Sequence, residues 1–493
     1  MTPDKSLAKK FQSMECFDKG IENSYQLLPS RFVSLSENRY LLTNEVGEYL
    51  IVSKKQLHGY VKKTLSKSSE FYFDLKSKHF LFDDDSNVAI QLLGLKYRTK
   101  AQKISQFTAL HIFVVSLRCD YSCKYCQVSR QTDDKVTFDM SKETANRSLD
   151  FVFKSPSPAI KIEFQGGEPL LNFEIIKYIV LSATELNKHH QKNLQFVITT
   201  NLTFLNTDIL SFCLIHNIYL STSLDGSEEL HNKNRPRPGK NGYQLTVKGI
   251  KEAQLYLGFD KVGALMTTTE NSLDCVKEII NEYLALDMHC IFLRPLSPYG
   301  FAIKNKQTDK YNLQRWFEFY TEGLEYIIDL NKKGYFFTEI YTQIILSKIF
   351  SPFGTSYVDL QSPTGAGISA IVYNYNGDVY ASDEARMLAE MGDSHFRLGN
   401  VHHSSYPDVM LSDVLLDTLE YSLAESSPMC HECGFLPYCG TDPVYHYATQ
   451  HDVVGHKAVS GFCNKNMKIF RYIFSLLERD EVTKNILLSW VRP

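Results

Sequence analysis

The sequence lacks several features that would assign the chain to a simple class. It has no apolar run approaching the roughly eighteen residues that a membrane-spanning helix needs. Its first residues, Met1 to Gln12, carry charges but no apolar core, so they do not predict a signal peptide. The charges nearly balance, at 53 Lys and Arg against 56 Asp and Glu, which argues against a general electrostatic attraction to nucleic acid or to an anionic membrane. These absences predict a cytoplasmic protein with no nucleic-acid or membrane partner.

The length predicts more than one domain. With 493 residues, 43% of them hydrophobic, the chain exceeds one ordinary domain and can bury a sizeable core. Three short β-rich runs come first, at residues 31–35, 39–43 and 48–53. A helix over 54–65 and a weaker helical stretch reaching Phe82 follow, so a small α+β domain is expected over residues 1–95. The basic stretch Lys96 to Lys103 is the expected linker.

A regular alternation of strands and helices follows this linker. Six apolar, β-rich segments occur at residues 109–117, 159–165, 194–201, 218–224, 262–269 and 290–296. Amphipathic helical stretches separate them, as at residues 141–154 and 172–189. Near-continuous apolar strands that alternate with helices predict a parallel sheet covered by helices. Six units favour a partial (β/α)6 barrel over residues 96–305, with its chemistry at the carboxyl ends of the strands.

The rest of the chain predicts two further segments. Residues 306–360 are expected to form a helical bridge of two helices split near Gly334. Residues 361–493 contain a hairpin signal at Asn376-Gly377 and end in a helical stretch over 464–490.

Three cysteines follow the first predicted strand of the barrel. Cys119, Cys123 and Cys126 are spaced C-x3-C-x2-C on one short stretch. A structural zinc site takes four protein ligands, and a catalytic one usually includes His or a carboxylate. Three thiolates instead fit a four-iron cubane with one iron left open to a small molecule. Zinc and coincidence are the alternatives.

A second cysteine cluster lies near the end of the chain. Cys430, Cys433, Cys439 and Cys463 supply four thiolates, which alone would favour a zinc site. The remaining four cysteines are scattered and are expected to be small buried apolar side chains: Cys16, Cys213, Cys275 and Cys290. Disulfides are not expected in a cytoplasmic chain.

The first cluster and the motifs after it resemble the radical S-adenosylmethionine (SAM) superfamily. In that family the three cysteines hold a [4Fe–4S] cluster whose open iron binds SAM, and its reductive cleavage yields a radical that abstracts hydrogen. The resemblance implies that the SAM-binding residues follow the strands. They are Tyr125 at the adenine, Gly166, Gly167 and Glu168 near the methionyl ammonium, Thr200 and Asn201 after the third strand, Ser223 near the ribose, and Arg235 at the carboxylate.

The second cluster resembles the SPASM extension of peptide-modifying members, which implies an auxiliary [4Fe–4S] cluster on these four cysteines. The fuller SPASM pattern binds two auxiliary clusters and has cysteine where this chain has Thr364, Ser382 and Pro443. We therefore expect one auxiliary cluster with four protein ligands. Asp383 aligns with the carboxylate that serves as base in sulfatase-maturing enzymes; a solvated turn residue is the alternative.

The whole chain, from about residue 25 to 490, resembles the radical SAM maturase of the His-Xaa-Ser peptide system. The strings that carry this resemblance include residues 111–130, 164–172, 292–301 and 374–384. It implies a precursor peptide as substrate, a second radical SAM maturase as a pathway partner, and a flavodoxin- or ferredoxin-type electron donor. Residues 30–85 then resemble small peptide-recognition (PqqD-like) domains that bind a leader by strand addition. A structural cap is the alternative for that domain.

The prediction is therefore a radical SAM enzyme that modifies a ribosomally made peptide. A sulfatase-maturase-like oxidation of a protein Ser or Cys is an alternative within catalysis. A non-catalytic iron–sulfur protein that binds a peptide for another maturase, and a zinc scaffold, are the alternatives outside it.

Overall fold

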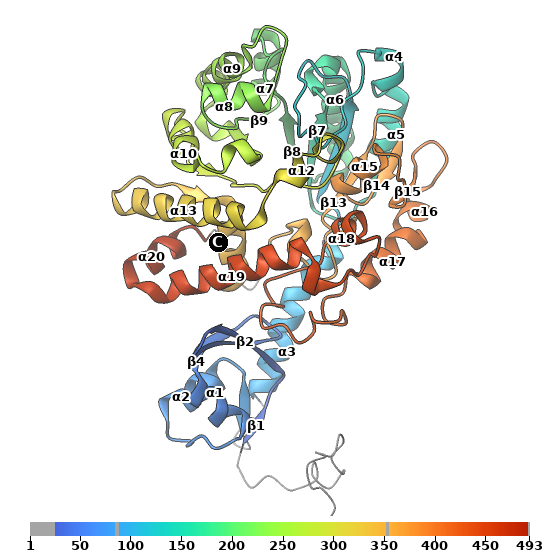
Figure 1. The fold of residues 1–493 in the computed structure, drawn as a ribbon. Coiled ribbons are helices and arrows are strands. Elements are labelled where there is room, and N and C mark those ends of the chain that lie inside the picture. Colours follow the sequence, from blue (N-terminus) through green and yellow to red (C-terminus); the bar gives the residue numbers. More distant parts are fainter. Residues whose placement is uncertain (1–24, 84–87, 352–353, 492–493) are drawn as a thin grey trace, which may run out of the picture. The chain divides into compact units, whose positions relative to one another are not determined.

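The computed structural model describes residues 25–83, 88–351 and 354–491 (Figure 1). The chain divides into two compact units, Met1–Arg98 and Thr99–Pro493. The predictions for residues 1–12 and for Cys16 lie outside the described residues. Within those described ranges, no helix is both long enough and apolar enough to cross a membrane.

The first unit contains the three predicted strands as an antiparallel sheet. Its strands run in the order β2 (Ser30–Ser36), β3 (Arg39–Asn44), β4 (Tyr49–Ser53), so β2 and β4 are edge strands. Helix α1 (Lys54–Val61) begins where Ser53 and Gln56 form a capping box, which satisfies backbone donors at the helix start. One hydrophobic core joins the sheet to the helices and includes Leu42, Val52, Tyr60 and Leu75.

Two predictions for this region need correction. The second helix, α2 (Glu70–Ser77), stops before Phe82, and Leu81–Asp83 instead forms strand β5, which pairs with β1 (Tyr25–Leu27). The expected linker over residues 96–103 is mostly helical, because α3 runs over Val88–Ala101. Residues 96–103 contain neither Gly nor Pro and are rich in good helix formers, so their basic charge does not prevent a helix.

The second unit is built on one eight-stranded sheet with the order β10-β9-β8-β7-β6-β13-β14-β15. Five neighbouring parallel strands of this sheet match predicted segments: β6 (Leu110–Ser116), β7 (Ala159–Gly166), β8 (Asn193–Thr199), β9 (Ile218–Ser223) and β10 (Val262–Leu265). The helices between them include α5 (Lys142–Val152), α6 (Phe173–His190), α7 (Thr207–Ile215), α8 (Glu228–Asn234) and α9 (Gly242–Leu257), and α10 (Val276–Ala285) follows β10. The α/β fold with a parallel, partly closed sheet is confirmed.

The sixth predicted strand does not join this sheet. Only Cys290–Ile291 (β11) is a strand, and it pairs with β12 (Thr338–Glu339) in a separate two-stranded sheet. Pro295 and Pro298 follow closely, and proline cannot donate to a strand ladder. The segment still runs beside the end of β10, since the Thr268 N–H donates to the Arg294 carbonyl at 3.0 Å.

The C-terminal part of the chain extends the same sheet. Strand β13 (Ala370–Tyr373) pairs in parallel with β6, and β14 (Asp378–Tyr380) and β15 (Arg397–Asn400) continue it antiparallel. The turn between β13 and β14 is the predicted Asn376-Gly377, with Gly377 at φ +87°. His111 on β6 and Tyr373 on β13 are hydrogen-bonded, Nδ1 to hydroxyl, at 3.0 Å.

Helices cover the rest of this unit (Figure 1). The split predicted near Gly334 separates α13 (Leu313–Lys332) from α14 (Ile340–Phe350), and Gly334 has φ +89°. The C-terminal helical stretch is two helices, α19 (Gly461–Arg479) and α20 (Glu481–Ser489), and Arg479 of α19 is ion-paired with Glu325 of α13. The helices α15 (Asp383–Ala389), α17 (Asp413–Tyr421) and α18 (Pro443–Gln450) follow the hairpin.

Candidate active site

The three cysteines of the first cluster lie on the loop that leaves β6. The Tyr121 N–H donates to the Cys119 Sγ at 3.5 Å, and the Cys126 N–H donates to the Cys123 carbonyl at 3.2 Å. The loop is also bonded to the segment that follows α8, because the Ser122 N–H donates to the Pro236 carbonyl at 2.8 Å. All three thiols are free and partly buried.

These thiols fit a cluster better than a single ion. Across the described ranges, no group of three or more His, Cys, Asp or Glu side chains is arranged to hold one metal ion. In a cubane each thiolate binds a different iron, so its ligands stand farther apart than those of one ion. Three partly buried thiols on one loop, without a carboxylate or imidazole among them, fit the donor set expected for a cubane with an open iron.

The glycine pair after β7 packs against the strand that carries the cysteine loop. The Gly167 N–H donates to the Ser116 carbonyl at 2.8 Å, and the Glu168 N–H donates to the Arg118 carbonyl at 2.7 Å. A Cβ on Gly167 would lie 2.3 Å from the Arg118 carbonyl oxygen. The glycines are therefore required for close backbone contact beside Cys119, whatever else they bind.

Glu168 links the ends of β7 and β8. Its carboxylate is fully buried and accepts hydrogen bonds from the Leu170 N–H at 3.0 Å, the Thr200 hydroxyl at 2.6 Å and the Asn201 N–H at 2.7 Å. Burial raises the pKa of Glu168 to about 7, although these three donors favour the charged form. The strand ends are thus held together by one carboxylate.

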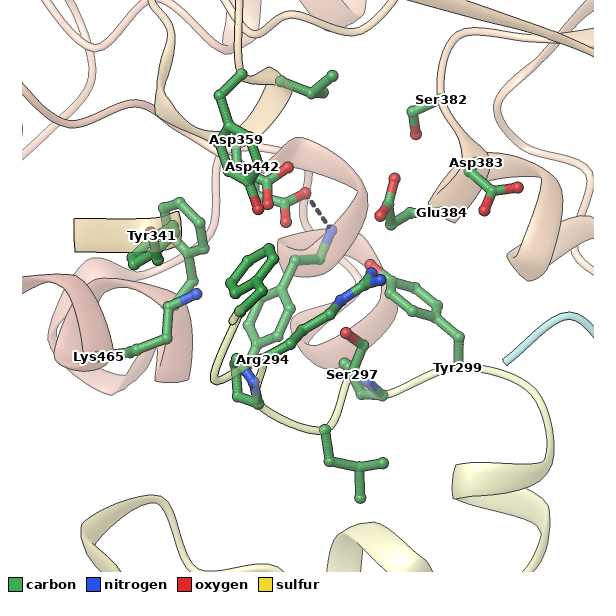
Figure 2. A pocket seen from close by; sticks show the side chains of 18 of the residues that line it. Arg294, Ser297, Tyr299, Tyr341, Asp359, Ser382, Asp383, Glu384, Asp442 and Lys465 are labelled. Atoms are coloured by element: carbon green, nitrogen blue, oxygen red, sulfur yellow. Dashed lines mark hydrogen bonds between the residues drawn. The ribbon is translucent and has the colours of Figure 1, made fainter. Parts of the chain in front are cut away.

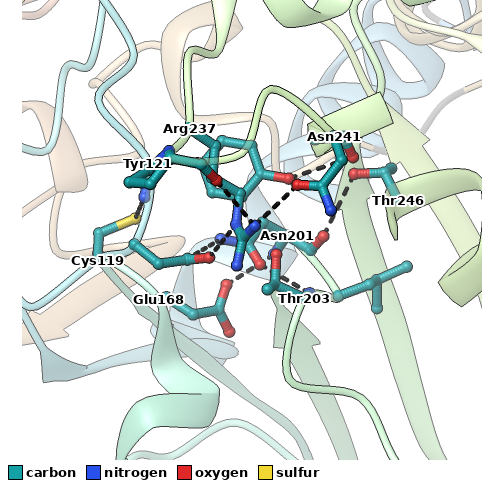
Figure 3. Close-up of polar contacts among 12 residues, drawn as sticks. Cys119, Tyr121, Glu168, Asn201, Thr203, Arg237, Asn241 and Thr246 are labelled. Carbon is teal, nitrogen blue, oxygen red and sulfur yellow. Dashed lines mark hydrogen bonds and ion pairs between the residues drawn. The ribbon is translucent and has the colours of Figure 1, made fainter. Parts of the chain in front are cut away.

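A second set of polar contacts reaches the cysteine loop through Asp120, which sequence reasoning missed. Its two oxygens accept from the Asn201 side-chain amide at 2.8 Å and from the Arg237 Nε at 2.8 Å. Arg237 also donates to the Asn241 Oδ1 at 2.9 Å (Figure 3). The position of Asp120 directly after Cys119 was the only available signal. These contacts fix the loop against β8 and the start of α9.

Tyr125 and Arg235 share a buried carboxylate. The Tyr125 hydroxyl donates to the Asp225 Oδ2 at 2.7 Å, and the Arg235 Nε lies 3.1 Å from the same oxygen. The Arg235 guanidinium also lies over the Tyr125 ring, 5.3 Å from its centroid. Sequence reasoning selected the ring and the guanidinium but not Asp225, which is fully buried and holds both. Ser223 is the last residue of β9, two residues before Asp225.

The second cysteine cluster surrounds one small cavity. All four thiols, of Cys430, Cys433, Cys439 and Cys463, line a space of about 110 Å³. Burial raises the pKa of Cys430 to about 11 and that of Cys439 to about 12. Four thiols in one apolar-walled cavity fit a fully protein-ligated cluster. Asn466 adds a contact, its amide nitrogen 3.9 Å from the Cys439 Sγ.

A much larger cavity, of about 580 Å³, lies between the barrel strands and the C-terminal segments. Asp383 is in its lining, and its Oδ1 is ion-paired with the buried Arg386 at 2.9 Å. Glu384 also lines it, and burial raises the pKa of Glu384 to about 7, with Asp359 and Asp383 adding to the effect. Figure 2 shows Glu384 directed toward Asp359 and Asp442, and Asp383 directed away from them.

Comparison with known proteins decides the family of the barrel. The model of the radical SAM superfamily matches residues 113–282, which include the cysteine loop and the ends of β6 to β10. This segment is a radical SAM domain. The superfamily is one of enzymes, and the fold expected for this segment is confirmed.

Curated relatives match parts of the chain. The uncharacterized protein MJ0907 of Methanocaldococcus jannaschii is 29% identical over 188 residues, covering 38% of this chain and 62% of its own length. The radical SAM cyclopropyl synthase TigE of Paramaledivibacter caminithermalis is 26% identical over 30% of this chain and 34% of its own. A cysteine-type anaerobic sulfatase-maturating enzyme of Clostridium novyi is 22% identical over 73% of this chain and 95% of its own. The chain thus spans less than two thirds of the first two relatives.

Solved structures share the fold over most of the chain. The sulfatase-maturating enzyme anSMEcpe with bound AdoMet aligns with a TM-score of 0.61 at 17% identity, covering 78% of this chain and 98% of its own. Streptococcus suis SuiB bound to its precursor peptide SuiA aligns with a TM-score of 0.51 at 15% identity, covering 87% of this chain and 98% of its own. At these identities the likeness shows that the radical SAM domain and the segments after it are folded alike.

The scattered cysteines differ in burial. Cys213 is fully buried, as expected, whereas Cys275 and Cys290 are only partly buried. The predicted SAM-binding residues lie at or after the carboxyl ends of β6 to β9, except Arg235, which is the C-cap of α8 and contacts Asp225. Their individual roles remain predictions.

Proposed function

We propose that this protein is a radical SAM maturase that modifies a ribosomally made precursor peptide. The observation that carries the proposal is the meeting of a three-cysteine loop with polar residues from the ends of neighbouring strands, inside a radical SAM domain. A [4Fe–4S] cluster and SAM, when bound, supply the hydrogen-abstracting chemistry. The protein positions them, excludes water and holds the peptide.

The proposed ligands of this cluster are Cys119, Cys123 and Cys126. The proposed SAM contacts are Tyr125 for the adenine, Gly166, Gly167 and Glu168 for the ammonium end, Thr200 and Asn201 beside it, Ser223 for the ribose and Arg235 for the carboxylate. The buried triad of Tyr125, Asp225 and Arg235 supports this assignment, since the ring and the cation are held rigidly beside the cysteine loop.

The proposed auxiliary site holds one [4Fe–4S] cluster on Cys430, Cys433, Cys439 and Cys463. The residues at the three positions where the fuller pattern has cysteine serve other purposes. The Ser382 hydroxyl caps α15 by accepting from the Ala385 N–H at 3.2 Å, and Pro443 is the first residue of α18. Thr364 is buried, with its N–H bonded to the Ser422 hydroxyl at 3.0 Å. These uses support a single auxiliary cluster.

A peptide of the His-Xaa-Ser type is the proposed substrate. The large cavity next to the radical SAM domain has room for side chains of a peptide, and two neighbours by fold were crystallised with peptides. Asp383, at the wall of this cavity, is the proposed base, with Arg386 fixing the position of its carboxylate. A second radical SAM maturase and a flavodoxin- or ferredoxin-type donor are the proposed partners.

The decisive experiment measures iron, sulfide and deoxyadenosine in anaerobically prepared protein. Wild type should hold about eight irons, and a Cys119→Ala/Cys123→Ala/Cys126→Ala variant about four, with deoxyadenosine release after dithionite reduction lost only in the variant. Equal iron in the two proteins, with no deoxyadenosine from either, would remove the enzyme proposal and favour a non-catalytic peptide-binding role.

Oxidation of a protein Ser or Cys, as in sulfatase maturation, is the second candidate. The observation that favours it is the match to a sulfatase-maturating enzyme over 95% of that enzyme's length. Mass spectrometry after reaction with a His-Xaa-Ser precursor peptide, and separately with a sulfatase-derived peptide, distinguishes the two: each proposal requires a mass change in its own peptide.

The N-terminal unit is the proposed recognition module for the peptide leader. Its strand β2 lies at the edge of the three-stranded sheet and carries an exposed Phe32, a surface suited to strand addition. Deleting residues 1–87 leaves helix α3 whole. Loss of leader binding with retained SAM cleavage supports recognition, whereas retained leader binding favours a structural cap.

A further inference from the structure

Three carboxyl groups from separate segments meet in the large cavity. Asp359 comes from the loop before β13, Glu384 from the first turn of α15, and Asp442 caps the start of α18 by accepting from the Tyr445 N–H at 2.9 Å. All three belong to the lining of the same 580 Å³ space and face one another across it (Figure 2). Their convergence is a tertiary feature, since no motif in the sequence links the three positions.

The cavity is lined by more carboxyl groups than cationic groups. Among the described residues that line it, the cations are Arg294 and Lys465. Arg294 acts on Asp359 and Glu384, and Lys465 acts on Asp359 and Asp442. Asp383 does not change this balance, because Arg386 neutralises it. A fourth lining carboxylate, Glu163, has neutral donors only, the amide of Gln165 at 2.7 Å and the hydroxyl of Thr199 at 2.9 Å.

The pKa values of the three converging carboxyl groups are raised. Burial raises the pKa of Asp359, of Glu384 and of Asp442, and for Glu384 and Asp442 the neighbouring carboxylates raise it further. Lys465 offsets only part of the charge, since its ammonium also lies over the rings of Tyr341 and Phe462, at 5.2 and 5.3 Å from their centroids. The lining therefore has more carboxyl groups than cations to pair with them.

An unpartnered hydroxyl points to a ligand in the same space. Tyr299 lines the cavity and is 1% exposed, yet its hydroxyl has no hydrogen-bond partner among the described residues. Leaving a buried polar group without a partner is unfavourable, so a ligand that supplies a donor or acceptor there is favoured. Figure 2 shows Tyr299 beside Glu384 and Arg294.

We propose that this cavity receives one positively charged side chain of the peptide, bound between Glu384, Asp359 and Asp442, with the Tyr299 hydroxyl accepting a hydrogen bond from it. The proposal rests on the proposed function in one respect, that the ligand belongs to a peptide. The cation supplies a further positive charge, its N–H groups satisfy the phenol oxygen, and the aromatic walls add cation–π attraction. The site thereby selects a basic residue for placement beside the radical chemistry.

Binding of small amides to the full-length holoprotein tests this directly. The probes are N-acetyl-arginine amide, its neutral isostere N-acetyl-citrulline amide, and N-acetyl-glutamate amide, measured by isothermal titration calorimetry at pH 8. Arginine amide should bind at least tenfold more tightly than citrulline amide, and glutamate amide should show no binding. Equal affinity for arginine and citrulline, or no arginine binding at 50 mM, overturns the proposal.

Variants locate the binding site. Glu384→Gln should lose at least tenfold in arginine affinity and most of the discrimination against citrulline, and Tyr299→Phe should weaken arginine by a smaller factor. The matched control is Asp417→Asn, which removes one exposed carboxylate of α17 and should change nothing. If Glu384→Gln fails to fold by circular dichroism, Asp359→Asn takes its place. Arginine affinity unchanged in the folded variant overturns the assignment.

The same preparations separate this proposal from the proposed function. Deoxyadenosine release on reduction reports the radical SAM chemistry without any amide bound. Normal release without charge discrimination overturns the cation site alone, whereas discrimination without iron or deoxyadenosine overturns the enzyme assignment alone.

Discussion

His111 makes the stability of the second unit depend on pH in a predictable direction. Its ring is 1% exposed and lies between the Thr108 carbonyl, 3.1 Å from Nε2, and the Tyr373 hydroxyl, 3.0 Å from Nδ1. Burial lowers the pKa of His111 to about 3, whereas an exposed histidine titrates near 6.5. Between these two values the unfolded chain binds a proton that the folded chain does not, so stability falls as the pH falls below 6.5.

The expected size follows from the two pKa values. Lowering the pH from 6.5 to 5 should cost about 1.6 kcal/mol of unfolding free energy through His111 alone, with a limiting slope of about 1.4 kcal/mol per pH unit. A His111→Gln variant keeps a donor and an acceptor at this position but does not titrate. Its pH-dependent loss should therefore be smaller than that of wild type by about the same amount.

The assay is urea unfolding at pH 6.5 and pH 5, on iron-free protein so that acid loss of a cluster does not contribute. Other histidines titrate equally in both proteins and cancel in the comparison. A Gln variant with the same pH-dependent loss as wild type would refute the claim that His111 is buried in its neutral form between β6 and β13.

Three further outcomes are expected at the SAM end of the sheet. Glu168→Gln places an amide N–H against a buried donor and should destabilise the protein by about 1–3 kcal/mol in urea unfolding; stability equal to wild type would contradict the three-donor arrangement. Gly167→Ala should cost about 1–3 kcal/mol and reduce iron to that of the triple-cysteine variant, because the Cβ meets the Arg118 carbonyl, whereas Gly263→Ala, in open space, should change neither. Asp225→Asn should weaken SAM binding at least tenfold in equilibrium dialysis, and unchanged binding would count against the buried triad.

The parts of the fold that repeat a simple pattern could be predicted from sequence. The apolar segments of β6 to β10 and the Asn376-Gly377 turn carry local signals, because strand burial and turn geometry restrict residue type. The prediction of a sixth sheet strand over residues 290–296 was wrong. The apolar residues near 290 fit a strand, but Pro295 and Pro298, which follow them in the sequence, prevent a strand ladder.

The candidate site was predictable where motif residues are adjacent in sequence and not where they meet only in the folded chain. The cysteine loop, the glycine pair and Arg235 were selected from the sequence as site residues, whereas no role was assigned to Asp225 or Asp120, because an aspartate after a strand is usually a solvated turn residue. The cavity carboxylates Asp359 and Asp442 had no local signal at all, since their significance comes from facing Glu384 across a space that only the tertiary structure creates.

The pairing of β13 with β6 has a consequence for how this chain is made. The two strands are about 260 residues apart, and β6 precedes the cysteine loop directly. Until β13 has been synthesised, one edge of β6 presents unpaired backbone groups, which attract other strands and promote aggregation. The barrel sheet therefore cannot be completed from its own residues. A chain truncated after residue 305 should aggregate, and cofactor insertion should follow, not precede, synthesis of the C-terminal segments.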